Sequence, residues 1–506
     1  MSAAGKIIRQ SLHSGLFYVL YTASRILLAI ALGKTLSSQE YGFYSLVGAA
    51  IGIGTGILPL RADQYFVREV PGRPEKEACW IFKSVVGVQT ILFLGLLAVV
   101  LLLPPLRHRA ELLMGLPSRS RLLVLIALLI ILESLANEFN RYLYARKEIE
   151  KGNLASFLQT GLWGAVIFAL FLLKPSAVTI QVVLWAWLIG VSAAVLYAAK
   201  QSNPRLLLAA PLVPAVYLTA VRFGLPIVLN NSLQVANSIS RFVICRYHSL
   251  ETVGAVSYSY NLILMIGALS APLAATPIQP YQIEAYNNGQ KKKSGSLLQT
   301  ELRYRLMTVA PLLIVAVFWE KELIRLFAKS DFLVPGHLMA FLAPIPLFLT
   351  VSSLFERILF LERRTAAIGR CYLYAAAMQI GLLFLLVPWN PYQGTALALD
   401  GGLWALSLFL FFHIREKELS LRTDFRPIAA SSLLSTAAAW AAYHILPAMN
   451  PFLTLLCATG IVLPVFLVSL LIFRAVPESE RRHLATFIQE KLPILKLKPH
   501  KGEGHG

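Results

Sequence analysis

Four polar residues recur at helical spacing inside an apolar stretch near the middle of the chain, namely Asn230, Gln234, Asn237 and Arg241. Their spacing of i, i+4, i+7 and i+11 puts them on one face of a helix. Near the N-terminus, Tyr18, Thr22 and Arg25 repeat the first three positions of this pattern as polar residues. Arginine binds phosphate oxygens through paired hydrogen bonds, while amides and hydroxyls bond to sugar hydroxyls. The two faces predict a polar cavity that suits an anionic, hydroxyl-rich ligand.

Further charged residues lie in or beside apolar runs. Arg61 and Asp63 stand at the end of the second run, and Glu133 lies inside the fourth. A charge at mid-bilayer costs roughly 3 kcal/mol or more, so such residues usually face a bundle interior or a water-filled cavity. We expect Arg61 to line the cavity, with a pair to Asp63 as the alternative. Asp63 and Glu133 are candidates for ion coupling, although Glu133 could instead form a salt bridge.

The elements that position these residues follow from composition. Of 506 residues, 57% are hydrophobic and 14% are charged, against about 45–50% and about 25% in soluble domains. A membrane-spanning helix needs about 20 apolar residues. We expect an all-α, polytopic membrane protein with about fourteen transmembrane helices, at residues 14–34, 41–60, 79–103, 121–140, 154–173, 178–199, 224–247, 252–278, 305–327, 335–360, 366–388, 392–414, 427–447 and 451–473.

Charge indicates the orientation of these runs. Most of the 46 Lys and Arg residues fall in alternate connections, on the same side as the N-terminus. Because cytoplasmic loops carry an excess of Lys and Arg, we expect both termini to be cytoplasmic. One outside loop runs against this bias and carries Arg107, Arg109, Arg119 and Arg121.

The chain also contains an internal repeat at an offset of 212 residues. Ser37, Gly42 and Ser45 match Ser249, Gly254 and Ser257, and each copy follows a helix with a polar face. Six spans separate the copies, so both have the same orientation, as in transporters with two parallel repeats. We expect two parallel six-helix lobes at 1–200 and 201–415, two further helices at 416–475 and a cytoplasmic tail at 476–506.

Several stretches carry a resemblance to a known family, namely Arg25–Gly33 leading into Glu40–Ser45, Arg222–Pro226, Glu322–Ala328 and Val387-Pro388 before Gly394–Ala398. In this order and spacing the chain resembles the Wzx-type polysaccharide flippases, of the superfamily that includes MATE exporters and MurJ lipid II flippases. It departs from the family at Pro59-Leu60-Arg61, where members often have a glycine-containing turn.

The resemblance implies twelve to fourteen helices in two lobes that flip an undecaprenyl-diphosphate-linked oligosaccharide across the bacterial cytoplasmic membrane, for O-antigen or exopolysaccharide synthesis. It implies membrane lipids and possible polysaccharide assembly proteins as partners. The alternatives are a MurJ-like lipid II flippase and a MATE-type exporter, although MATE proteins usually carry inward acidic residues. A membrane polymerase or ligase is disfavoured, because the outside loops are short and offer no paired carboxylates.

Other classes of function find no support in the sequence. The basic residues are spread through loops between apolar runs, so we expect no nucleic-acid partner. The four cysteines are far apart and form no CxxC pair, so we expect no metal site. No phosphate-cradling glycine motif, HExxH or GxSxG occurs, so we expect neither catalytic residues nor a cofactor.

Overall fold

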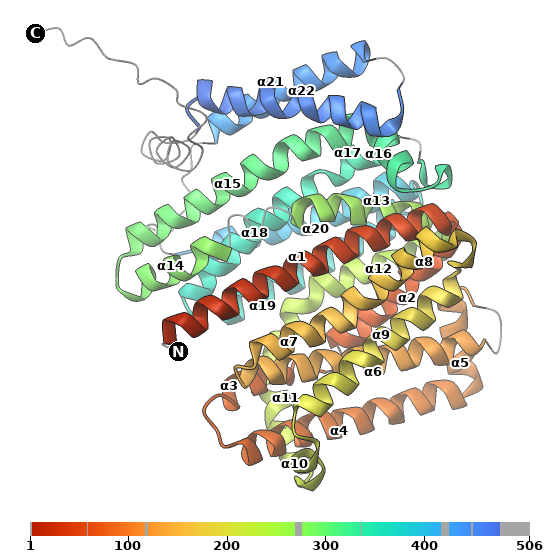
Figure 1. Cartoon of the computed structure of the whole chain (residues 1–506), viewed down its shortest axis with the longest axis vertical. Coiled ribbons are helices and arrows are strands. Elements are labelled where there is room, and N and C mark those ends of the chain that lie inside the picture. Colours follow the sequence, from red (N-terminus) through yellow and green to blue (C-terminus); the bar gives the residue numbers. More distant parts are fainter. Residues whose placement is uncertain are drawn as a thin grey trace, which may run out of the picture.

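The chain folds into a bundle of long helices (Figure 1). The computed structural model describes residues 3–57, 59–116, 120–268, 276–334, 336–415, 425–446 and 449–475, and every regular element in them is helical. The expected tail at 476–506 lies outside these residues. An all-α fold is confirmed.

The first half of the chain supplies six long helical segments, of which the fifth contains a π-helical stretch. Its elements are α1 (Ala3–Thr35), α2 (Ser38–Ile57), α3 (Asp63–Glu69), α4 (Glu75–Leu102), α5 (Pro104–Leu113), α6 (Arg121–Ala145), α7 (Ile149–Ser156), η1 (Phe157–Leu162), α8 (Trp163–Leu173), η2 (Pro175–Ala177) and α9 (Ile180–Gln201).

The second half follows the same order and ends in two extra helices. Its elements are α10 (Pro204–Ala209), α11 (Pro214–Val228), η3 (Leu229–Asn231), α12 (Ser232–Tyr247), α13 (Leu250–Ala268), α14 (Thr276–Asn287), α15 (Lys291–Phe318), α16 (Glu320–Phe327), η5 (Ser330–Phe332), α17 (Leu338–Leu342), α18 (Pro344–Leu361), α19 (Thr365–Leu386), α20 (Pro391–His413), α21 (Arg426–Ile445) and α22 (Pro451–Ile472).

Each of the fourteen expected runs falls on helix where the structure describes it, with two changes. The seventh run is broken at η3, a single 3₁₀ turn between α11 and α12. The ninth expected run covers residues 305–327. In the structure, α15 starts earlier, at Lys291, and ends at Phe318, and the rest of the run forms a separate amphipathic helix, α16. The apolar run marked only part of α15, because the first turns of this helix carry the basic residues that follow Gln290.

The bundle has the surface of a membrane protein. Among the described residues, eight helical segments are long and apolar enough to cross a bilayer. Large apolar side chains are exposed along them, such as Leu173 at 85% and Leu196 at 71%. A soluble monomer rarely leaves large contiguous apolar patches in water, whereas a bilayer covers them. The chain is a multi-pass membrane protein.

The two halves meet through a reciprocal contact between α2 and α13. A Cβ built on Gly42 would lie 1.9 Å from the carbonyl oxygen of Leu250, and one built on Gly254 would lie 1.8 Å from that of Ser38. Both pairs are related by the 212-residue offset, so each half presents the same surface to the other. The repeat expected from the sequence is therefore present as paired halves.

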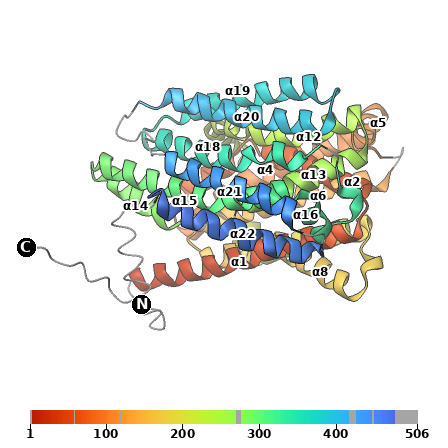
Figure 2. The ribbon, with the colours of Figure 1, turned by 90° about the horizontal axis from the view of Figure 1, so that it is seen from above.

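The last two helices lie outside this symmetry. Both α21 and α22 pack on α15, and α22 also packs on α16. Figure 1 shows them along one edge of the bundle, next to α15, and in Figure 2, seen from that edge, they lie in front of the other helices.

Candidate functional site

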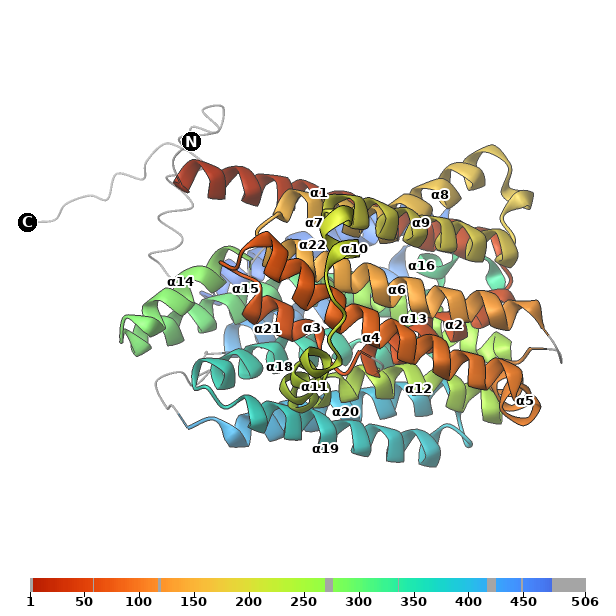
Figure 3. The same cartoon turned by 90° about the horizontal axis from the view of Figure 1, so that it is seen from below.

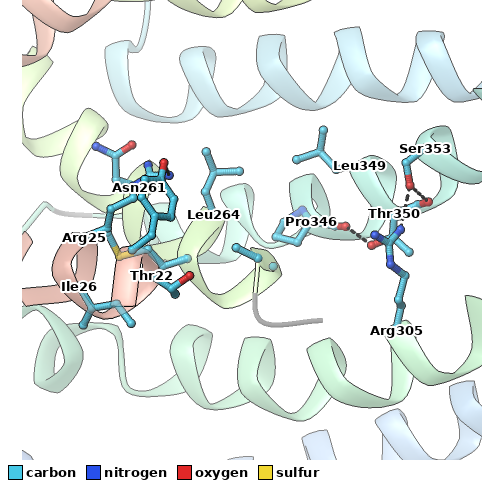
Figure 4. Close-up of a pocket in the computed structure, with 14 residues that line it drawn as sticks. Thr22, Arg25, Ile26, Asn261, Leu264, Arg305, Pro346, Leu349, Thr350 and Ser353 are labelled. Atoms are coloured by element: carbon cyan, nitrogen blue, oxygen red, sulfur yellow. Dashed lines mark hydrogen bonds between the residues drawn. The ribbon is translucent and has the colours of Figure 1, made fainter. Parts of the chain in front are cut away.

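A polar cavity lies between the two halves. It has a volume of about 390 Å³ and is lined from α1 by Tyr21, Thr22, Arg25 and Ile26, from α13 by Asn261, Leu264, Met265, Gly267 and Ala268, from α15 by Arg305, and from α18 by Pro346, Leu349, Thr350 and Ser353. The first half thus contributes one helix and the second half three. Figure 4 shows Arg25 and Arg305 on opposite sides of the intervening Pro346.

Arg25 faces the cavity from the middle of α1. Its guanidinium donates to the Tyr21 hydroxyl at 3.2 Å, and its central carbon lies 5.6 Å from the centre of the Tyr21 ring. The side chain is otherwise exposed, so most of its five donors are available to a ligand. Thr22 lines the same cavity, whereas the side chain of Tyr18 lies outside the part that the structure describes.

Arg305 is held by a polar network of the second half. It donates to the Ser353 hydroxyl at 2.8 Å and lies 3.7 Å from a carboxylate oxygen of Glu301. Glu301 is fully buried and also pairs with Arg357. Arg357 and Arg305 together outnumber this carboxylate, so the network presents net positive charge beside the cavity.

An apolar pocket adjoins the polar cavity. It is lined by Ile26, Ala29 and Ile30 of α1, Leu262, Met265 and Ile266 of α13, and Leu323 and Phe327 of α16. Ile26 and Met265 line both spaces. A basic, polar site and an apolar site therefore lie next to each other between α1 and α13.

In the polar face of the seventh span, Asn230 lies in the η3 turn, and the other three residues lie on α12. Asn237 and Arg241 line a small space between α12, α13 and α20, apart from the main cavity. Gln379 of α19 donates to the Asn237 side chain at 2.7 Å, and Arg241 donates to the Asn237 carbonyl at 3.2 Å. Asn230 is half-buried and Gln234 is exposed, and neither lines either space. The structure therefore brings together Thr22 with Arg25, and Asn237 with Arg241, in separate places.

Arg61 and Asp63 follow α2 in a strained turn. Leu60 and Arg61 have φ of 48° and 54°, a left-handed conformation that is uncommon outside glycine. Gly224 of α11 approaches this turn so closely that a Cβ there would lie 2.4 Å from the Leu60 carbonyl oxygen. Asp63 pairs with Arg141 of α6 rather than with Arg61. Neither Arg61 nor Asp63 lines the main cavity.

Glu133 is buried in a network of the first half. Its carboxylate accepts from the Gln159 amide and from the Trp187 indole, both at 2.5 Å. Gln159 in turn accepts from the Asn140 amide at 2.9 Å. The described partners of Glu133 are neutral, so the network joins η1, α6 and α9 without the arginine considered from the sequence.

One end of the bundle is closed between the halves. We call it the α1–α2 end, because α1 ends and α2 begins there. Lys34 donates to the carbonyl of Arg325 at 2.6 Å, and Lys329 donates to those of Gly33 and Thr35 at 2.9 Å and 2.5 Å through its backbone and side chain. The Tyr258 hydroxyl of the second half also lies 3.3 Å from the Ala29 carbonyl of α1, to which it donates. Carbonyls near the ends of α1 and α16 thus accept hydrogen bonds from the opposite half.

Arg305 and Asn261 are cavity residues that the sequence did not single out. Arg305 follows Lys291, Lys292, Lys293 and Arg303 in one of the alternate connections that carry most of the basic residues. The ninth expected run starts at residue 305, so the sequence puts Arg305 at a membrane edge, whereas the structure puts it 14 residues after the start of α15. Asn261 donates to the Tyr41 hydroxyl at 3.0 Å. Ser257, four residues before it on α13, was the available sequence signal, because the two lie on one face of the helix.

The fold was compared with those of solved structures, and the sequence with known families and proteins. No family model and no curated protein matches the sequence. The lipid II flippase MurJ in its inward closed conformation is similar with a TM-score of 0.70 and 15% identity, over 92% of this chain and 99% of that one. An inward-facing multidrug resistance MATE transporter of the MOP superfamily is similar with a TM-score of 0.55 and 16% identity, over 78% of this chain and 93% of that one. The chain has the fold that these membrane transporters share.

Proposed function

We propose that the chain translocates a polyprenyl-diphosphate-linked oligosaccharide across the bacterial cytoplasmic membrane for surface polysaccharide synthesis. The observation that carries the proposal is the junction of a basic, polar cavity with an apolar pocket between α1 and α13. A lipid-linked sugar has the same two parts. Its charged headgroup needs hydrogen-bond partners inside the bilayer, while its hydrocarbon chain needs an apolar surface.

The charge of the cavity favours a diphosphate over a cation. Arg25 and Arg305 come from different halves of the chain and face one cavity, and none of the described residues that line it is acidic. Hydrogen bonds from arginine to phosphate are charge-assisted and stronger than neutral ones. The same absence of lining carboxylates disfavours export of cationic drugs.

The closed α1–α2 end supports alternating access. The halves are joined there by backbone contacts, while the cavity lies deeper between α1, α13, α15 and α18. With the N-terminus cytoplasmic, this end faces outward, and separating it while closing the opposite end would move a bound headgroup across. Glu133 and Asp63 stay candidates for ion coupling in this scheme.

Lipid II is the second candidate substrate. The similar MurJ structure is named as a lipid II flippase, and lipid II also joins a polyprenyl chain to a sugar through a diphosphate. The cavity chemistry above fits both substrates, because it recognises the shared diphosphate.

Proteoliposomes with a fluorescent polyprenyl-diphosphate oligosaccharide test the proposal. We expect flipping by the intact chain and a tenfold to hundredfold loss in each of Arg25→Ala and Arg305→Ala, since a charged hydrogen bond contributes about 1.5–3 kcal/mol. Arg370→Ala removes an exposed arginine of α19 that does not line the cavity, and should leave flipping unchanged.

Lipid II in the same vesicles separates the two substrates. If lipid II is flipped and the polyprenyl-diphosphate oligosaccharide is not, then lipid II is the substrate and the proposed polysaccharide substrate is wrong. No flipping of either lipid by a correctly folded protein would refute the transport proposal. Full activity of both cavity variants would instead refute the binding of the headgroup by Arg25 and Arg305.

A further inference from the structure

The outside loop that runs against the charge bias, with Arg107, Arg109, Arg119 and Arg121, lies beside a separate groove that is wholly apolar. This groove lies on the side of α2 and α12, has a volume of about 410 Å³, and is lined by residues such as Ile53, Leu97, Ala110, Met114, Ile126 and Phe242. They come from α2, α4, α5, α6 and α12. Every residue that lines the groove is apolar or glycine, so nothing in it could bond to a sugar or a phosphate.

The groove faces the hydrocarbon of the membrane. Leu96 of α4 and Leu113 of α5 line it with 51% and 58% of their surfaces exposed. Its volume is within the range of about 300–1,000 Å³ that is usual for small-molecule sites. A hydrocarbon chain from the bilayer can reach it sideways, between α4 and α12.

The groove is bordered by α5, a short helix at the α1–α2 end of the bundle (Figure 3). Its apolar side chains include Leu112 and Leu113, which are 62% and 58% exposed, while His108 and Arg109 are also exposed. A helix with an apolar and a basic face lies in the headgroup layer of a membrane. The helix thus has apolar side chains that suit the hydrocarbon next to basic side chains that suit the headgroup layer.

Two arginines at this level are available for a headgroup. Arg109 directly precedes Ala110, which lines the groove, and Arg121 lies two residues before Leu123, which also lines it. Both are exposed and form no ion pair with another described residue. Arg107, by contrast, pairs with Glu111 at 3.0 Å, and Arg119 lies outside the described residues.

We infer that this corner binds an anionic phospholipid of the surrounding bilayer, with an acyl chain in the groove and the phosphate on Arg109 and Arg121. Because Arg109 and Arg121 are both positively charged, we expect an anionic lipid to bind more tightly than a zwitterionic one. The inference depends on a membrane-embedded bundle and not on the proposed transport, because the groove shares no lining residue with the polar cavity.

Native mass spectrometry of the detergent-purified chain with phosphatidylglycerol or phosphatidylcholine tests the site. We expect preferential binding of phosphatidylglycerol. The double variant Arg109→Gln/Arg121→Gln should bind it about thirtyfold more weakly, since each basic residue near an anionic lipid contributes roughly a factor of five. Ala110→Phe should also lower binding by filling the groove without removing a charge.

A matched control removes two exposed charges at the same end but away from the groove. Lys174→Gln/Lys321→Gln should bind phosphatidylglycerol as the unchanged chain does. Equal binding by the arginine double variant, equal binding of phosphatidylcholine, or displacement of phosphatidylglycerol by polyprenyl phosphate would each overturn the inference. Unchanged melting temperatures of the variants exclude misfolding as the cause of a loss.

Discussion

Gly42 and Gly254 stand where the backbones of the two halves touch. The 1.9 Å and 1.8 Å separations that a Cβ would have from facing carbonyl oxygens leave no space for any side chain. Small residues let membrane helices approach closely, so that van der Waals contact holds them together. The sequence match at these positions thus has a steric cause that only the folded chain shows.

Alanine at this contact should destabilise the protein. Gly42→Ala forces α2 away from α13 and should cost roughly 1–3 kcal/mol, as overpacking does elsewhere. Gly48→Ala is the control, because a Cβ there meets nothing within 4 Å and alanine favours helix by about 1 kcal/mol. Thermal unfolding in detergent should show a lower midpoint for Gly42→Ala alone. Equal midpoints would contradict the proposed packing.

Among the candidate site residues, the sequence predicted Arg25 and Thr22 as cavity residues by their spacing, and both line the cavity. It could not place Asn230 relative to Asn237, because Asn230 lies in the 3₁₀ turn η3, which breaks the helical spacing before α12 begins. Arg305 was missed because loop and helix charges look alike in a basic segment. Burial and partner choice, as for Asp63 with Arg141, depend on distant helices.

At the scale of helices, α1 and α16 hold the α1–α2 end closed. Their ends exchange hydrogen bonds through Lys34 and Lys329. Such bonds satisfy carbonyls that would otherwise have no partner, and they can be replaced by water once the helices separate. These contacts can therefore be made and broken repeatedly.

A cross-link between these helices should stop transport. In a cysteine-free background, Thr35→Cys/Lys329→Cys places one thiol on each of the two segments that are in contact here. If the halves separate there during each cycle, oxidation should abolish flipping and a reductant should restore it. Each single-cysteine variant should be unaffected by oxidation. Normal flipping by the oxidised double variant would show that this end stays closed throughout the cycle.

At the scale of the whole molecule, the orientation in the membrane stays a prediction from loop charge. It requires that the polar cavity communicate with the cytoplasm while the α1–α2 end is closed. Leu349, 39% exposed, lines this cavity, whereas Lys174 is exposed at the α1–α2 end.

Labelling from each side of the membrane tests this orientation. In a cysteine-free background, a membrane-impermeant thiol reagent should modify Leu349→Cys in inside-out vesicles and Lys174→Cys in spheroplasts. The reverse result would invert the topology and place the cavity on the outer side.

The fold itself could be predicted in large part, because long apolar runs and a 212-residue repeat survive in the sequence. The apolar runs predicted the order of the long helical segments, and the matched glycines predicted that the two halves have the same orientation. The breaks at η3 and between α15 and α16 could not be predicted, since tertiary packing decides them.

The glycine contact between α2 and α13 has one more consequence. Because peptide backbone meets peptide backbone there, a side chain on either glycine would have to push α2 and α13 apart. We therefore expect a bulky substitution at Gly42 or Gly254 to open the seam between the halves and to let small ions leak across the membrane.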